Sequence, residues 1–187
     1  MRILSLFLLA LSSSAWAAPQ FCSRPDGKAE QLICSDPELQ ARDKSLTAVY
    51  AAARQKAKPA QQKLLAAEQK GWWRGIRDCW KADDLQACVA SGYELRTVEL
   101  QTSWKLVPAH EPLHFRCADG ADISVTYFVT QPSSLIAIRK NEQSLMRSAP
   151  AASGARYVGR NESFWEHQGE VRLTWGNQAP ETTCVKQ

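Results

Sequence analysis

Histidines and closely spaced cysteine pairs are scarce in this chain of 187 residues. It holds three histidines and six cysteines, and no two cysteines have the C-x₂-C spacing of a zinc knuckle, since the nearest two are Cys79 and Cys88. We therefore expect no metal site, and nothing in the sequence predicts a cofactor. In an exported protein an even number of cysteines indicates disulfides instead.

Charge of one sign and long apolar runs are also scarce. The formal net charge is only +4, and lysine and arginine are interleaved with aspartate and glutamate. A nucleic-acid-binding protein usually presents a dense basic stripe, so we expect no nucleic-acid partner. No stretch after residue 17 is long and apolar enough to be a transmembrane helix.

Motifs of known catalytic machinery are absent as well. The chain has neither a G-x-S-x-G nor an H-E-x-x-H motif. Ser153, His167 and either Asp119 or Asp122 can be combined on paper into a Ser–His–Asp set, but any chain of this size permits such a combination. We expect that the protein is not an enzyme, and a hydrolase built on Ser153 and His167 is kept as an alternative.

The first 17 residues are typical of a secretory signal peptide. Arg2 supplies a positive start, residues 3–11 form an apolar run too short to span a bilayer, and Ala15-Trp16-Ala17 is a small-x-small cleavage pattern before Ala18. The residues before Cys22 are not the small ones of a lipoprotein signal, so we expect no lipid anchor. These features predict a soluble protein exported to the periplasm.

Residues 18–101 have helical periodicity and predict a small, disulfide-stapled α-helical domain. Ser35-Asp36-Pro37-Glu38 has the form of a capping box with proline in the first turn of a helix. Pro59 interrupts the pattern, so a second helix is expected over residues 60–80, and a third is expected to start near Asp84.

Four cysteines lie near the ends of these predicted helices. Those ends meet if the first two helices are antiparallel, which favours the pairs Cys34–Cys79 and Cys22–Cys88. Three pairings are possible among four cysteines, and the sequence alone leaves them open.

One aspartate and a group of three tryptophans in this half each have competing interpretations. Asp43 falls on the apolar face of the first helix, where it is either a binding acid or, as we expect, a group with an internal cap or partner such as Arg77 or Arg96. The second helix carries three tryptophans that either pack in the core, which we favour, or stack on sugars or on a partner; they are Trp72, Trp73 and Trp80.

The periodicity changes to two in the C-terminal part. Residues 102–112, with two prolines, are interpreted as a linker. In residues 113–187 short alternating segments such as Ile123, Val125, Tyr127 and Val129 are separated by turn signals, which predicts a small antiparallel barrel or sandwich. Cys117 and Cys184 lie near its two ends, so a disulfide between them is expected to join the first and last strands.

The segment ASGARYVGRNESFWEHQGE, residues 152–170, combines a small polar tip with nearby aromatic and basic groups. Serine and glycine are ordinary turn residues, so the tip is either a structural β-turn or a contact loop.

Several stretches of the C-terminal part resemble the MliC/PliC family, inhibitors of c-type lysozyme. They are FRCADG at 115–120, SVTYF at 124–128, SGARY at 153–157, FWEHQGE at 164–170 and the closing Cys184. The resemblance implies an eight-stranded antiparallel β-barrel with a disulfide, and a loop that inserts into the active-site cleft of c-type lysozyme, the expected protein partner. The implied lysozyme-binding residues are Ser153, Gly154, Ala155, Arg156, Tyr157 and His167.

The N-terminal part resembles the LprI-type domain, some members of which are linked to lysozyme inhibition. The matching stretches are ICSDPEL at 33–39, EQKGWW at 68–73, RDCW at 77–80 and the run from Cys88 through Tyr93 to Leu95-Arg96. An alternative function is a cell-envelope module that binds a protein or peptidoglycan through this helical domain. The oligomeric state and the class of lysozyme are left open.

His167 departs from the MliC/PliC pattern, which commonly has lysine at this position. Lysine is charged at any physiological pH, whereas an imidazole titrates near pH ~6.5. We therefore hypothesise that inhibition depends on pH, and that the substitution either weakens inhibition or directs it to a different lysozyme.

Overall fold

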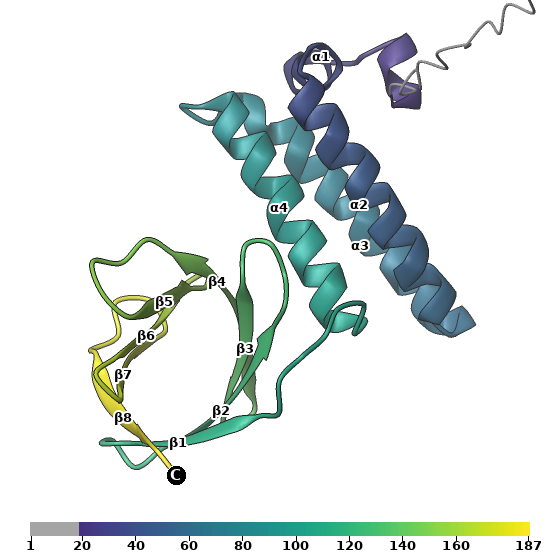
Figure 1. Cartoon of the computed structure of the whole chain (residues 1–187). Coiled ribbons are helices and arrows are strands. Elements are labelled where there is room, and N and C mark those ends of the chain that lie inside the picture. Colours follow the sequence, from purple (N-terminus) through teal and green to yellow (C-terminus); the bar gives the residue numbers. More distant parts are fainter. Residues whose placement is uncertain (1–18) are drawn as a thin grey trace, which may run out of the picture.

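The computed structural model describes residues 19–187, which fold into a helical part followed by a closed β-barrel (Figure 1). This confirms the fold class predicted from the change in periodicity. The predicted signal peptide, residues 1–17, lies outside the described residues. Within residues 19–187 no helix is both long and apolar enough to cross a membrane.

The helical part contains four α-helices and two short 3-10 helices. Their bounds are η1 Gln20–Ser23, α1 Lys28–Ser35, α2 Pro37–Lys56, α3 Pro59–Arg77, η2 Asp78–Lys81 and α4 Leu85–Ser103. The proline in the first turn of α2 and of α3 lacks only an N–H that a helix start leaves unpaired anyway. Asp36 caps α2 by accepting from the backbone N–H of Glu38 at 2.8 Å. The cap is therefore Asp36 and not Ser35, because the Ser35 hydroxyl donates back to the Leu32 carbonyl.

The core of this part lies between α2, α3 and α4. Its buried side chains include Leu39, Leu46, Leu65, Ile76, Val89, Tyr93 and Leu100. Trp72 belongs to the packing: its Nε1 donates to the Gly92 carbonyl at 3.0 Å, and its ring meets that of Tyr93 edge-on. Trp80 differs, since 56% of its surface is exposed.

The predicted disulfides of the helical part are wrong. The bonds join Cys22 to Cys34 and Cys79 to Cys88, which are 12 and 9 residues apart. The chain reverses direction between η1 and α1, and again between η2 and α4, so the nearest cysteine in space is also the nearest in sequence. Each bond therefore fixes one local turn and does not link distant helix ends.

The predicted partner of Asp43 is also wrong. Its Oδ1 accepts a hydrogen bond from the Tyr93 hydroxyl at 2.9 Å. Arg77 instead pairs with Asp26 and Glu30, and Arg96 with Glu99 and Glu68. Burial raises the pKa of the Asp43 carboxyl, an effect that the Tyr93 hydrogen bond partly opposes.

Eight antiparallel strands form the barrel, each paired with its neighbours in sequence and β1 with β8. Their bounds are β1 Leu113–Cys117, β2 Asp122–Phe128, β3 Ser134–Arg139, β4 Glu142–Ala149, β5 Ala155–Val158, β6 Glu162–His167, β7 Glu170–Trp175 and β8 Thr182–Lys186. Alternate side chains fill the interior, among them Val125, Leu135, Met146, Phe164 and Leu173. Val129 is an exception, because β2 ends at Phe128 and Val129 is exposed.

The disulfide Cys117–Cys184, predicted from the sequence, is confirmed. The two residues stand directly opposite each other in the β1–β8 ladder and are both buried. The bond therefore reinforces the seam at which the barrel closes.

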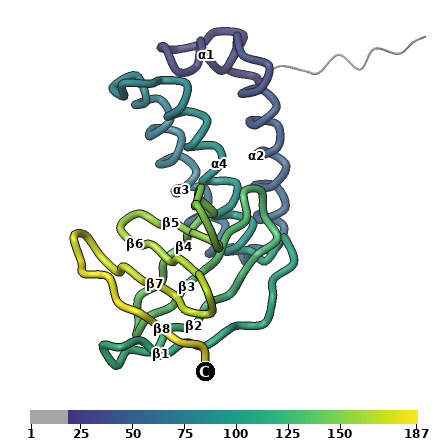
Figure 2. Tube along the Cα trace, turned by 60° about the vertical axis from the view of Figure 1, so that its left-hand side comes forward, coloured from purple at the N-terminus to yellow at the C-terminus, as the bar shows by residue number. Residues whose placement is uncertain are grey.

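The helical part and the barrel are connected by more than the chain itself. Between α4 and β1 the backbone pairs with the end of β2, through His110 N–H to the Tyr127 carbonyl at 2.9 Å and Val129 N–H to the Pro108 carbonyl at 3.0 Å. Arg147 of β4 forms an ion pair with Glu94 of α4. In Figure 1 α4 is the helix nearest the barrel, and Figure 2 shows the molecule turned by 60°.

Candidate functional site

The loop between β4 and β5 carries the small polar tip singled out in the sequence. Residues 150–154 are exposed, and β5 begins at Ala155. The indole Nε1 of Trp165, on β6, donates to the Ser153 carbonyl at 2.9 Å. This bond fixes the backbone of the tip to the barrel while the short side chains of the tip stay in solvent.

Gly154 is required by the shape of the tip. Its φ is +71°, in the left-handed region that L-residues rarely adopt. A Cβ at this position would lie 2.1 Å from the Glu166 carbonyl oxygen and 3.3 Å from His167 Cα. The tip therefore rests directly against the backbone at the end of β6.

His167 lies at the same end of the barrel, at the turn between β6 and β7. Gln168 and Gly169 form the turn with φ of +52° and +82°, the positive values of a type I′ hairpin. The imidazole stacks on the Trp165 indole, with ring centroids 5.4 Å apart and planes 21° from parallel. The structure thus brings the tip at Ser153-Gly154 together with His167, as the sequence suggested.

Two arginines flank Trp165 on the outer surface of the barrel. In the strand register Trp165 stands opposite Arg156 of β5 and Arg172 of β7, and both arginines are exposed. The Arg172 guanidinium lies over the indole at 5.2 Å from the ring centroid. The tip and this basic and aromatic surface together form one site, made by Ser153, Gly154, Arg156, Trp165, His167 and Arg172 and called here the rim site.

Tyr157 has a different orientation from its neighbour Arg156, because adjacent strand residues point to opposite faces. Its half-buried ring meets the Tyr127 ring edge-on at 5.6 Å, and the Tyr127 hydroxyl donates to Glu166 Oε2 at 3.1 Å. Burial, and then the Glu166 charge, raise the pKa of both tyrosines, so they stay neutral. The side chains of Tyr157, Tyr127 and Glu166 therefore support the strands that carry the rim site.

The Ser–His–Asp set considered for a hydrolase does not assemble. Consecutive turns of an up-and-down barrel lie at opposite ends, so Asp119, in the β1–β2 turn, is at the end away from Ser153 and His167. Asp119 pairs with Arg139, and Asp122 with Arg116. Among residues 19–187 there is also no group of three side chains suited to hold a metal ion.

Trp165 and Arg172 were absent from the site residues predicted from the sequence. Both could have been found from one signal, the two-residue turn Gln168-Gly169 between segments of alternating polarity. A two-residue hairpin fixes the register, which places Trp165 opposite Arg172.

Comparison with known proteins supports both resemblances. Residues 22–87 match the family described as lysozyme inhibitor LprI, and residues 115–182 match the family described as membrane-bound lysozyme inhibitor of c-type lysozyme, MliC. The lipoprotein LprI of Mycobacterium tuberculosis is 32% identical over 155 residues, which cover 81% of this chain and 77% of that protein, and LprI of Mycobacterium bovis gives the same values.

This chain belongs to the LprI family. The match to LprI extends over both the helical part and the barrel, because it covers 81% of the chain. Among solved structures, that of Pseudomonas aeruginosa MliC in complex with hen egg white lysozyme is 18% identical, with a TM-score of 0.36, and the match covers 43% of this chain and 86% of that one. The two family resemblances inferred from the sequence are confirmed.

Proposed function

We propose that this LprI-family protein inhibits c-type lysozyme by inserting the tip of its β4–β5 loop into the active-site cleft. The observation that carries the proposal is the tip itself: exposed small residues fixed by Trp165 and by the close approach of Gly154 to β6, beside exposed cationic groups. Both matching families are described as lysozyme inhibitors.

The chemistry of the rim site complements that of the target. A c-type lysozyme works with two carboxyls, a general acid in an apolar pocket and a second group that stays ionised. The Ser153 hydroxyl can donate a hydrogen bond to one of them, and the cationic groups near Trp165 favour the ionised one. A hydrogen bond to a charged group contributes about 1.5–3 kcal/mol.

The tip is pre-organised, which favours tight binding. A loop that is ordered before it binds loses less conformational entropy in the complex. Here the tip is held by backbone contacts to β6, and β6 is itself fixed by the Tyr127–Glu166 bond. Inhibition therefore rests on shape and local contacts, which agrees with the small net charge of the chain.

We also propose that inhibition takes place in the periplasm. All six cysteines are joined in disulfides, a state that persists in oxidising compartments and is rare in the cytosol. This agrees with the signal peptide predicted in residues 1–17.

The proposal predicts that Ser153→Ala weakens inhibition. In a cell-wall lysis assay titrated with the protein, we expect the inhibition constant to rise about tenfold or more, since a hydrogen bond to a charged group is lost. Ser45→Ala, at an exposed position on α2, is the matched control and should inhibit like the wild type. No inhibition by the wild type, even in large excess, would show that the function of the family does not extend to this chain.

A second prediction concerns pH. An imidazole, with a reference pKa of about 6.5 for the residue type, is positively charged only at low pH, so the attraction that a lysozyme carboxylate would add at His167 weakens as pH rises. We expect calorimetric affinity for lysozyme to fall between about pH 5.5 and about pH 8. In the strand register Glu170 of β7 stands opposite His167, Glu166 precedes it on β6, and Arg172 stands opposite Trp165.

Two variants separate this effect from the titration of lysozyme itself. His167→Lys keeps a charge throughout the range, and His167→Gln carries none, so the fall attributed to His167 should disappear in both. If the affinities of the wild type and of His167→Gln for lysozyme change in parallel over this pH range, the imidazole has no part in the pH dependence.

A further inference from the structure

The helical part has a cleft that the rim site does not use. It lies between η1, α2 and α3 and encloses about 620 Å³, within the range of small-ligand sites. Its lining combines aromatic rings with amide, carboxyl and ammonium groups. The lining residues are Pro19, Gln20, Phe21, Gln40, Asp43, Lys44, Thr47, Gln69, Trp72 and Trp73.

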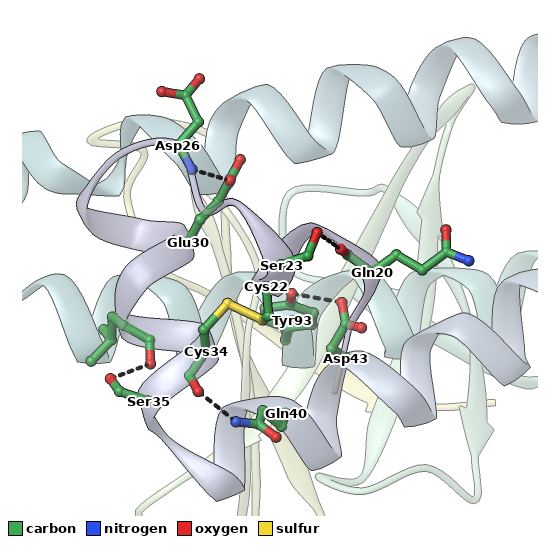
Figure 3. The surroundings of a disulfide bond; sticks show 11 residues. Gln20, Cys22, Ser23, Asp26, Glu30, Cys34, Ser35, Gln40, Asp43 and Tyr93 are labelled. Atoms are coloured by element: carbon green, nitrogen blue, oxygen red, sulfur yellow. Dashed lines mark hydrogen bonds between the residues drawn. A yellow bond between two sulfur atoms is a disulfide. The ribbon is translucent and has the colours of Figure 1, made fainter. Parts of the chain in front are cut away.

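One wall of the cleft is set by the disulfide Cys22–Cys34. Figure 3 shows this bond with Gln20, Gln40 and Asp43 around it. The bond ties η1 to α1, and Phe21 of η1 then packs on Trp73 of α3 with ring centroids 4.9 Å apart. Both rings are partly buried and both line the cleft.

The polar groups of the cleft are oriented by the helices behind them. Gln40 Nε2 donates to the Cys34 carbonyl at 2.7 Å, which leaves its Oε1 as an acceptor for a ligand. Gln69 Oε1 accepts from the buried Arg96 at 3.0 Å, which leaves its amide Nε2 as a donor. The Tyr93 hydroxyl holds Asp43 through Oδ1 at the base of the cleft.

These features restrict the ligand. An apolar ligand would remove water from Asp43 and from the two amides without replacing its hydrogen bonds, which is costly. The lining carries one carboxylate, Asp43, and one ammonium, Lys44, so it favours neither a polyanion nor a polycation. A neutral ring with hydroxyls at its edge and an apolar C–H face fits both the flat aromatic surfaces and the separate donor and acceptor groups.

From this we infer that the cleft between η1, α2 and α3 binds a neutral pyranose saccharide, stacked on Trp73 and Phe21 and hydrogen-bonded by Gln40, Asp43 and Gln69. The inference goes beyond lysozyme inhibition and does not depend on it, because the cleft is in the helical part and the rim site is on the barrel. The protein would then bind two ligands of different kinds through its two parts.

The test is titration of the full protein with triacetylchitotriose and, separately, with cellotriose, monitored by calorimetry and by the indole N–H signals in NMR. We expect saturable binding of at least one trisaccharide with a shift of the Trp73 signal, and stronger binding of triacetylchitotriose than of cellotriose would identify the acetamido group as a recognised feature. Trp73→Leu should lower affinity about tenfold, because the stacking surface is lost.

Trp80→Leu is the matched control, since Trp80 is exposed and lies outside the cleft. It should bind the trisaccharide like the wild type. Absence of saturable binding, or equal weakening by both tryptophan variants, would overturn the inference. Lysozyme inhibition by Trp73→Leu should equal that of the wild type, so failure of the saccharide site is distinguishable from failure of the rim site.

Discussion

If the tip inserts as proposed, Gly154→Ala should reduce lysozyme inhibition about a hundredfold, because the Ser153 contact is lost and the cationic groups near Trp165 are no longer aligned with the tip. The added Cβ would stand 2.1 Å from the Glu166 carbonyl oxygen, which is backbone and cannot rotate away. The tip must therefore move outward from β6, and its hydrogen bond with Trp165 must lengthen or break. A displaced tip no longer presents Ser153 and the cationic groups in one fixed arrangement.

The matched control for this variant is Gly120→Ala. Gly120 also has a positive φ, +80°, but nothing lies within 4 Å of the position that its Cβ would take. Both variants should lose about 1–2 kcal/mol of stability from the left-handed backbone, measurable by thermal unfolding. Only Gly154→Ala should lose inhibition, and if it inhibits like Gly120→Ala, the shape of the tip is irrelevant and the insertion proposal fails.

Removal of the Cys117–Cys184 bond is expected to have the largest effect on stability. The bond closes a loop of 67 residues, and loop-closure entropy assigns it about 4 kcal/mol. The bond Cys79–Cys88 closes only 9 residues, for which the same relation gives about 2.5 kcal/mol. A barrel of this size has little stability to spare, so the loss is a large fraction of the total.

The measurement is urea unfolding of the two paired variants, Cys117→Ala/Cys184→Ala and Cys79→Ala/Cys88→Ala. The two parts of the molecule can unfold separately, so each transition is assigned by the tryptophans it contains: Trp165 and Trp175 report on the barrel. The first variant should shift the barrel transition and the second should shift the helical one. Equal losses from the two would contradict the dependence on loop length.

Much of the fold followed from local signals in the sequence. The prolines at 37 and 59 and the aspartates at 36 and 84 mark helix starts by chemistry that acts within one turn, and the structure has a helix beginning at each. The alternation of apolar and polar residues predicted the strands, because it is also a signal between near neighbours in the sequence. Cys117–Cys184 was predictable because the two residues lie at the ends of one closed domain.

Long-range partners were not predictable in the same way. The disulfides of the helical part depend on how η1 and η2 reverse the chain, and no residue in either segment specifies that direction. Asp43 bonds to Tyr93, 50 residues away, because of how α2 packs on α4. In the rim site the sequence indicated the tip and His167, whereas Trp165 and Arg172 require the register that the Gln168-Gly169 turn sets between β6 and β7.

Closure of the barrel also bears on aggregation of the protein at high concentration. A lysozyme inhibitor that binds one enzyme molecule at a time must be present in amounts that match its target. Proteins at high concentration aggregate most readily by adding strands to an open sheet edge. In this barrel β1 pairs with β8, so none of the eight described strands offers a free edge for such addition.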